Sequence, residues 1–92
     1  MYSYEVKPNL KRILDKLHKK DKKQCEAILN KIEQVINSGD VEHYKNLRYD
    51  LSEFKGVHVA SSFVLIFKYD KKNNKISFED YDHHDRIYSK KR

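Results

Sequence analysis

The run Phe63-Val64-Leu65-Ile66-Phe67 is the longest apolar stretch of this 92-residue chain. A strand with apolar side chains on both faces is typical of the centre of a sheet that is covered on both sides for part of its length. Five residues are also far fewer than the roughly 20 that cross a bilayer. We therefore place residues 63–67 at the centre of a sheet and not in a membrane.

Alternating residues on both sides of this run predict further strands. One covers Phe54 to Val59, and another covers Lys75 to Tyr81 after a polar turn from Asp70 to Asn74. A first strand covers Tyr2 to Val6. In the last strand, alternation predicts that the side chains of Ile76, Phe78 and Asp80 lie on one face of the sheet. Those of Ser77, Glu79 and Tyr81 should lie on the other face.

Two amphipathic helices are predicted between the first and second strands. Pro8 suits a first helical position because it needs no N–H partner there. Asp21 suits the N-cap of the second helix, and Gly39 is expected to close it. Their apolar stripes are Leu10, Ile13, Leu14 and Leu17, and then Cys25, Ile28, Leu29, Ile32, Val35 and Ile36. Because few residues join the helices, they should form an antiparallel hairpin, with Cys25 as a core residue.

The expected architecture is therefore β-α-α-β-β-β, of the α+β class, in a single domain spanning residues 1–92. The helical hairpin should pack on one face of a mainly antiparallel sheet. The other face is then expected to remain open, and we look for the functional site there.

Charge favours an anionic partner. Lys and Arg number 20 against 14 Asp and Glu, with basic groups between Lys7 and Lys23 and at Lys90 to Arg92. Such surfaces often bind phosphates, although a Lys-rich helix face is also commonly just solvated. One cysteine excludes an intramolecular disulfide, and no signal-peptide pattern precedes Glu5. These features lead us to expect a cytoplasmic protein.

The histidines differ in their surroundings: His18, His43, His58, His83 and His84. We expect no role for the first two, which lie in polar segments. Strand alternation points His58 away from Val57 and Val59, and so toward the open face if those two face the helices. The pair at 83 and 84 lies among aspartates, but adjacent residues of an extended segment point apart and no standard ligand spacing is present. We therefore expect no metal and no cofactor.

His58 and His84 together suit metal-independent cleavage of RNA. The 2′-OH of RNA can attack the adjacent phosphate if a base, an acid and stabilising cations are present. Imidazole fits the first two roles because it titrates near neutral pH, and Lys and Arg fit the third. These residues leave open which histidine is the base and which the acid.

The same residues carry a resemblance to a known family. Leu47-Arg48, the stretch from Phe54 to Val59, the run from Phe63 to Phe67 and His84-x-x-x-Tyr88 together resemble the RelE/ParE toxin superfamily, and within it the YafQ branch. By position, His58 matches a strand histidine, His84 a C-terminal histidine and Tyr88 the aromatic residue that follows. Lys45 stands where that branch has another His, and Lys55 matches a Lys of RelE. Ser62 and Val64 depart from the pattern, replacing an acidic residue and an Arg.

The resemblance implies the toxin of a type II toxin–antitoxin system, an endoribonuclease or mRNA interferase that cuts messenger RNA in the ribosomal A site and inhibits translation. It also implies an antitoxin partner, acidic in the segment that wraps the toxin, in a hetero-oligomer, with no membrane partner. The expected site combines catalytic with RNA-binding residues: His58, His84, Tyr88 and Lys45, with Arg48, Lys55 and Arg86.

Two other functions remain open at this point. ParE-like relatives share the fold and poison DNA gyrase by binding it, without catalysis, and fold alone does not separate the two outcomes. A pure gyrase binder has no chemical need for His58, His84 and Tyr88. Alternatively, the basic helices bind structured RNA, with an affinity that falls steeply with salt.

Overall fold

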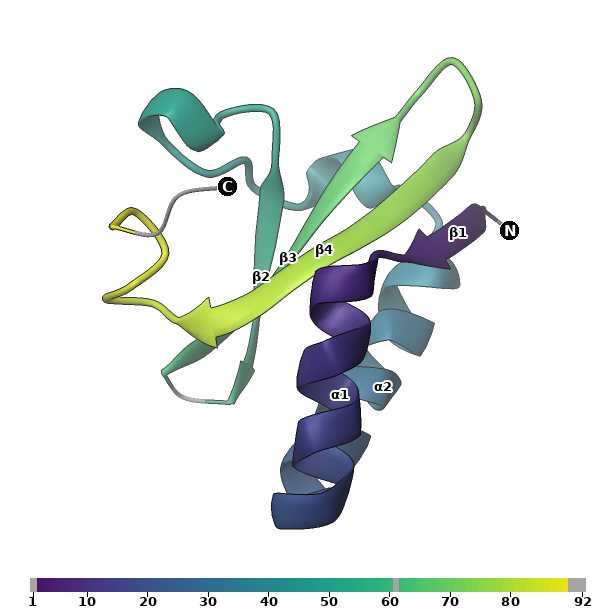
Figure 1. The fold of residues 1–92 in the computed structure, drawn as a ribbon. Helices are drawn as coiled ribbons and strands as arrows, with labels where there is room; N and C mark the ends of the chain where they lie inside the picture. The colour runs from purple at the N-terminus through teal and green to yellow at the C-terminus, as the bar shows by residue number, and fades with distance from the viewer. Residues whose placement is uncertain (1, 61, 90–92) are drawn as a thin grey trace.

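The structure, a computed structural model, describes residues 2–60 and 62–89 (Figure 1). The predicted order of elements is confirmed, with two 3₁₀ turns added between the second helix and the second strand. The elements are β1 (Ser3–Val6), α1 (Pro8–Lys20), α2 (Lys22–Ile36), η1 (Val41–His43), η2 (Tyr49–Leu51), β2 (Lys55–Ala60), β3 (Phe63–Asp70) and β4 (Lys75–His83). The basic tail at positions 90–92 lies outside the described residues.

The four strands form one mixed sheet in the order β1-β4-β3-β2. β1 runs parallel to β4, whereas the β2–β3 and β3–β4 pairs are antiparallel. β3, which contains the apolar run, therefore has a strand on each side. The predicted α+β class with a mainly antiparallel sheet is confirmed. No helix in the described part of the chain is long and apolar enough to cross a membrane.

The helical hairpin of α1 and α2 lies against one face of the sheet, and its far half extends beyond the sheet (Figure 1). Apolar residues of both helices form the main core with Leu65, Phe67, Ile76 and Phe78 from the strands. Asp21 caps α2 as predicted, accepting a hydrogen bond of 3.1 Å from the backbone N–H of Gln24. Alternation along β3 thus sends every second residue toward the helices.

The predicted end of α2 at Gly39 is wrong. The helix ends at Ile36, and Asn37 is the C-cap. The amide and hydroxyl groups of Ser38 both donate to the carbonyl of Val35. Because these bonds occupy a terminal carbonyl, no left-handed glycine is needed, and Gly39 has no positive φ.

The predicted facing of β4 is wrong for its second half. The β3–β4 register shifts between Ile66 and Phe67, which pair with Asp80 and Phe78, so Glu79 is an extra residue in a β-bulge. An inserted residue reverses the alternation beyond it. Tyr81 therefore joins Phe78 in the core under the helices.

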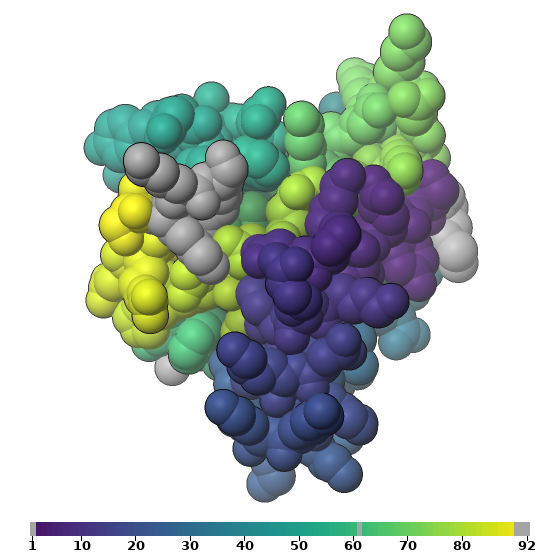
Figure 2. Space-filling model, in the orientation of Figure 1, coloured from purple at the N-terminus to yellow at the C-terminus, as the bar shows by residue number. Residues whose placement is uncertain are grey.

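The opposite face is less open than predicted. A second, smaller core contains Leu51, Val64, Ile66 and Ile87, with Leu47 and Phe54 packed against it. The segment 47–54 and the C-terminal segment after β4 thus cover part of this face, and they adjoin each other in Figure 2. The rest of the face is where the side chains of the predicted site gather.

Candidate functional site

A cavity of about 770 Å³ lies on this second face, between segment 43–49, β2 and the C-terminal segment after β4. Five residues that the sequence predicts for the site line it: Lys45, Arg48, His58, His84 and Tyr88. They come from three separate parts of the chain. The fold therefore brings two imidazoles, two cationic side chains and an aromatic ring to one concave surface.

His58 owes its position to the alternation of β2. Its strand neighbours Val57 and Val59 pack against the helix-covered core. His58 pairs with Val64 across the ladder, is exposed, and lines the cavity. Its orientation is the predicted one, and its catalytic role remains a prediction.

His84 is held by the turn between β2 and β3. Its backbone N–H donates to the carbonyl oxygen of Ser62 at 2.8 Å, and its Nδ1 lies 3.2 Å from the same oxygen. Its Nε2 lies 3.0 Å from Oδ1 of Asp85. Carbonyl and carboxylate oxygens only accept, so each contact is a hydrogen bond when the ring nitrogen that faces it carries the hydrogen. The contacts of His84 with position 62 use the backbone carbonyl of that residue. They therefore do not depend on Ser62 having the acidic side chain of the family pattern.

The C-terminal segment closes one side of the cavity. Ile87 is buried in the second core and anchors this segment to the sheet. The hydroxyl oxygen of Tyr88 accepts a hydrogen bond of 2.9 Å from the backbone N–H of Arg48. The rings of Tyr88 and Tyr49 meet edge to face, with centroids 5.8 Å apart. Residues about 40 positions apart in sequence are thus tied together at the site.

Tyr49 is a candidate that the sequence prediction missed. It lines the cavity, is 78% exposed, and has a left-handed backbone with φ of 59°. This conformation is uncommon for a bulky residue and costs free energy. Nothing in the local sequence signals it. His43, Tyr44 and Asn46 also line the cavity and were not predicted.

Lys55 lies where its charge faces protein oxygens and not the cavity. Its side chain is buried, and its Nζ donates to the carbonyls of Glu42 and Tyr44 and to Oδ1 of Asn46, at 3.4, 2.9 and 2.8 Å. The expected contact of Lys55 with phosphate is therefore not available in this structure. Its ammonium group instead holds the segment that carries Lys45 onto β2.

Arg86 is exposed and does not line the cavity. Its backbone N–H donates to the carbonyl of His83, and its own carbonyl accepts from Ser89. Any contact of its guanidinium with an RNA chain would therefore lie outside the cavity.

Gly56 allows the loop to approach the sheet closely. A Cβ placed there would meet Cδ2 of Leu47 at 2.8 Å and Cγ1 of Val64 at 3.0 Å. Val64, which replaces an Arg of the RelE pattern, is buried beside them in the second core. Val64 therefore supports the cavity by packing and contributes no charge to it.

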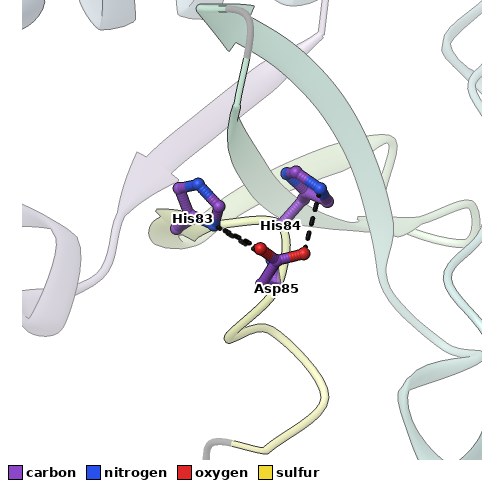
Figure 3. A group of neighbouring side chains, drawn as sticks. All are labelled: His83, His84 and Asp85. Atoms are coloured by element: carbon purple, nitrogen blue, oxygen red, sulfur yellow. Dashed lines mark hydrogen bonds and ion pairs between the residues drawn. The ribbon is translucent and has the colours of Figure 1, made fainter.

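The expectation that His83 and His84 point apart is wrong. Their rings stack with centroids 4.8 Å apart, and the carboxylate of Asp85 reaches both rings (Figure 3). β4 ends at His83 and the chain then turns, with the N–H of Asp85 donating to Nδ1 of His83. The prediction assumed an extended segment, whereas the turn folds three polar side chains together.

Comparisons with known proteins were made on sequence and on structure. No family model matches the chain. The chain is 50% identical over 92 residues, covering all of this chain and 96% of the relative, to a protein of Methanocaldococcus jannaschii whose name assigns it as toxin RelE4. The toxin–antitoxin complex RelBE2 of Mycobacterium tuberculosis aligns with a TM-score of 0.72 and 17% identity, over 90% of this chain and 98% of that chain. YafQ of E. coli aligns with a TM-score of 0.66 and 15% identity, over 96% and 99%.

Proposed function

The chain belongs to the RelE family, the toxins of toxin–antitoxin systems, and on that premise we propose that it is an endoribonuclease that cleaves messenger RNA at the ribosome. The observation that carries the proposal is the convergence of His58 and His84 with Lys45 and Arg48 on one cavity. A protein that only binds its target has no need for two imidazoles beside two cations. Cleavage of translated messenger RNA inhibits translation.

The proposed reaction is a transesterification within the RNA. The 2′-oxygen attacks the adjacent phosphorus, the bond from phosphorus to the 5′-oxygen breaks, and the products carry a 2′,3′-cyclic phosphate and a 5′-hydroxyl. One group must take the proton of the 2′-OH and another must protonate the leaving 5′-oxygen. No water or metal ion enters this scheme.

We assign His58 as the base and His84 as the acid. The structure describes no hydrogen bond from the His58 ring to another described residue, so a ring nitrogen is free to accept the proton of the 2′-OH. The contacts of His84 to Ser62 and Asp85 hold its ring in one orientation, and we give it the second role, protonation of the leaving 5′-oxygen.

The remaining residues of the cavity would bind the RNA. Lys45 and Arg48 place positive charge where the pentavalent phosphate gains negative charge, which lowers the barrier. Tyr88 and Tyr49 offer ring faces on which an unpaired base can stack. Arg86, outside the cavity, would hold a neighbouring phosphate of the chain.

The partner that controls this activity would be an antitoxin. The solved RelBE2 structure is a toxin–antitoxin complex of the same fold. For this chain, with a net charge of +6, we propose an antitoxin that is acidic in its wrapping segment, in a cytoplasmic hetero-oligomer with the toxin. Messenger RNA and the ribosome would be the other partners.

Cleavage of a translated messenger RNA in a cell-free translation system tests the proposal. Single general acid–base residues contribute about 10²–10⁴-fold, so His58→Ala and His84→Ala should each reduce the cleavage rate by that order. His18→Ala, on the exposed surface of α1, is the matched control. The ends of the fragments, mapped chemically, should be cyclic phosphate and 5′-hydroxyl.

Two results would contradict this function. If both His58→Ala and His84→Ala cleave at the wild-type rate, the assignment of these two histidines as base and acid is wrong. Inhibition of DNA gyrase supercoiling by the purified chain, with intact messenger RNA, would instead favour the gyrase-poison alternative.

A further inference from the structure

The turn after β4 gathers three metal-ligand side chains that the proposed cleavage does not require together. His83, His84 and Asp85 each offer one ligand atom, and these atoms lie within 4.8 Å of one another. Figure 3 shows the two imidazoles on the same side of the turn, with the carboxylate between them. The rings of His83 and Phe63 also meet edge to face, with centroids 5.5 Å apart, which helps to hold the His83 ring in place.

The separations fit a small transition-metal ion. Nδ1 of His83 lies 3.6 Å from Oδ2 of Asp85, and Nε2 of His84 lies 3.0 Å from Oδ1. Tetrahedral coordination with bonds of about 2.0–2.2 Å places ligand atoms about 3.3–3.6 Å apart. Each ring nitrogen lies close to that separation from the carboxylate oxygen that faces it, Oδ2 for His83 and Oδ1 for His84.

The hydrogen bonds around the rings orient one nitrogen of each toward Asp85. Nδ1 of His83 accepts from the N–H of Asp85 at 3.2 Å, so this nitrogen carries a lone pair, and an ion that binds it replaces this hydrogen bond. When Nδ1 of His84 donates to the Ser62 carbonyl, Nε2 is the atom left to bind a cation. A backbone carbonyl on the far nitrogen of a histidine is the usual outer contact in metal sites, where it fixes the ring and its tautomer.

The donor set selects the class of metal. Two imidazole nitrogens and one carboxylate suit Zn²⁺, Ni²⁺ or Cu²⁺, whereas Mg²⁺ and Ca²⁺ prefer oxygen ligands only. His84 and Asp85 are 51% and 73% exposed, so an ion can reach the site from solvent and retain water as a further ligand.

We propose that His83, His84 and Asp85 form a binding site for a divalent transition-metal ion, and that the bound ion inhibits the toxin. The inhibitory part rests on the proposed function. The ion takes the lone pair of Nε2 of His84, where the proposed acid carries its proton. A toxin with this ion bound therefore lacks its acid, and removal of the ion restores it.

Titration of the untagged chain with Co²⁺ tests the site directly. The visible d–d absorption should saturate at one ion per chain, and Zn²⁺ should displace the signal. Loss of outer-shell partners alone weakens metal sites about 10–100-fold. The ligand changes His83→Ala and Asp85→Asn should each weaken binding at least about tenfold, and His18→Ala should leave it unchanged. Wild-type Co²⁺ affinity in His83→Ala or Asp85→Asn would overturn the site.

Inhibition is measured separately as the ratio of cleavage rates with and without Zn²⁺. The ratio should fall well below one for the wild-type chain and stay near one for His83→Ala. If both chains give the same low ratio, the ion inhibits elsewhere and the inhibitory role is overturned. If the chain does not cleave under any condition, the function fails, while the Co²⁺ titration still decides the metal site.

Discussion

The two faces of the sheet differ in what their buried residues do. Under the helices, eleven buried residues of the part of the chain that the structure describes form one core. On the cavity face, four buried residues form a small core beneath segment 47–54 and the C-terminal segment. Because stabilisation by burial grows with apolar area, most of the free energy of folding should come from the helix-covered face.

The cavity face relies instead on individual contacts that place loops. Gly56 admits Leu47, Lys55 holds the backbone at Glu42 and Tyr44, and Tyr88 holds the backbone of Arg48. Each contact positions a segment that carries a residue of the proposed site. This difference predicts that changes on the two faces will separate stability from activity.

The largest loss of stability should come from the helix-covered core. Phe78 is fully buried there, and Phe→Ala changes in cores cost about 3–5 kcal/mol. On the cavity face, Leu51→Ala should cost less because it removes fewer buried atoms, and because Leu51 is 7% exposed and belongs to the smaller core. Denaturant unfolding of both variants measures the two free energies. An equal or larger cost at Leu51 would contradict the difference between the faces.

Gly56→Ala should damage activity more than stability. The added methyl group meets Leu47 and Val64 at 3.0 Å or less, and such overpacking costs about 1–3 kcal/mol. Moving Leu47 also moves its neighbour Arg48, so cleavage should fall at temperatures where the variant is fully folded. Gly39→Ala is the control, since no described atom lies within 4 Å of a Cβ placed there. Unchanged cleavage by a folded Gly56→Ala variant would show that segment 44–49 does not need this packing.

Tyr88→Phe should have a smaller effect. The variant keeps the ring but removes the acceptor for the Arg48 N–H, a bond worth about 0.5–1.5 kcal/mol. The cleavage rate should decline modestly because the segment that carries Arg48 is held less firmly. The free energy of unfolding should fall by no more than the value of that hydrogen bond. Tyr4→Phe, on the exposed edge of β1, is the comparison. A loss as large as that of His84→Ala would assign the hydroxyl a direct chemical role.

The smallest effect concerns pH. Burial raises the pKa of Glu79 at the bulge, so between its usual value and the raised one the folded state binds more protons than the unfolded state. Stability attributable to Glu79 should therefore fall as pH rises through that window, and Glu79→Gln should remove the fall. Glu5 should behave oppositely, because Lys7 and Lys75 lower its pKa. The free energy of unfolding of the wild-type chain and of Glu79→Gln, measured between pH 3 and pH 7, gives the direction of the effect. If the contribution of Glu79 to this free energy rises with pH, the prediction is wrong.

The sequence predicted the features that follow from local periodicity. The helices, the strands and the orientation of His58 all follow from spacing along one segment. The bulge at Glu79 and the acceptors around Lys55 depend on how distant segments meet, so no local pattern signals them. The same holds for the left-handed Tyr49 and for the turn that brings Asp85 back to His83.

The most direct test of the account is a double-mutant cycle on the cleavage rate of His58→Ala, His84→Ala and the double variant. Catalytic residues that act as one unit are strongly non-additive. If both imidazoles serve one phosphate in the cavity, the double variant should cleave about as slowly as the slower single variant. If the fold-loss of cleavage rate in the double variant equals the product of the two single losses, the histidines act independently. That result would contradict a shared site on the cavity face.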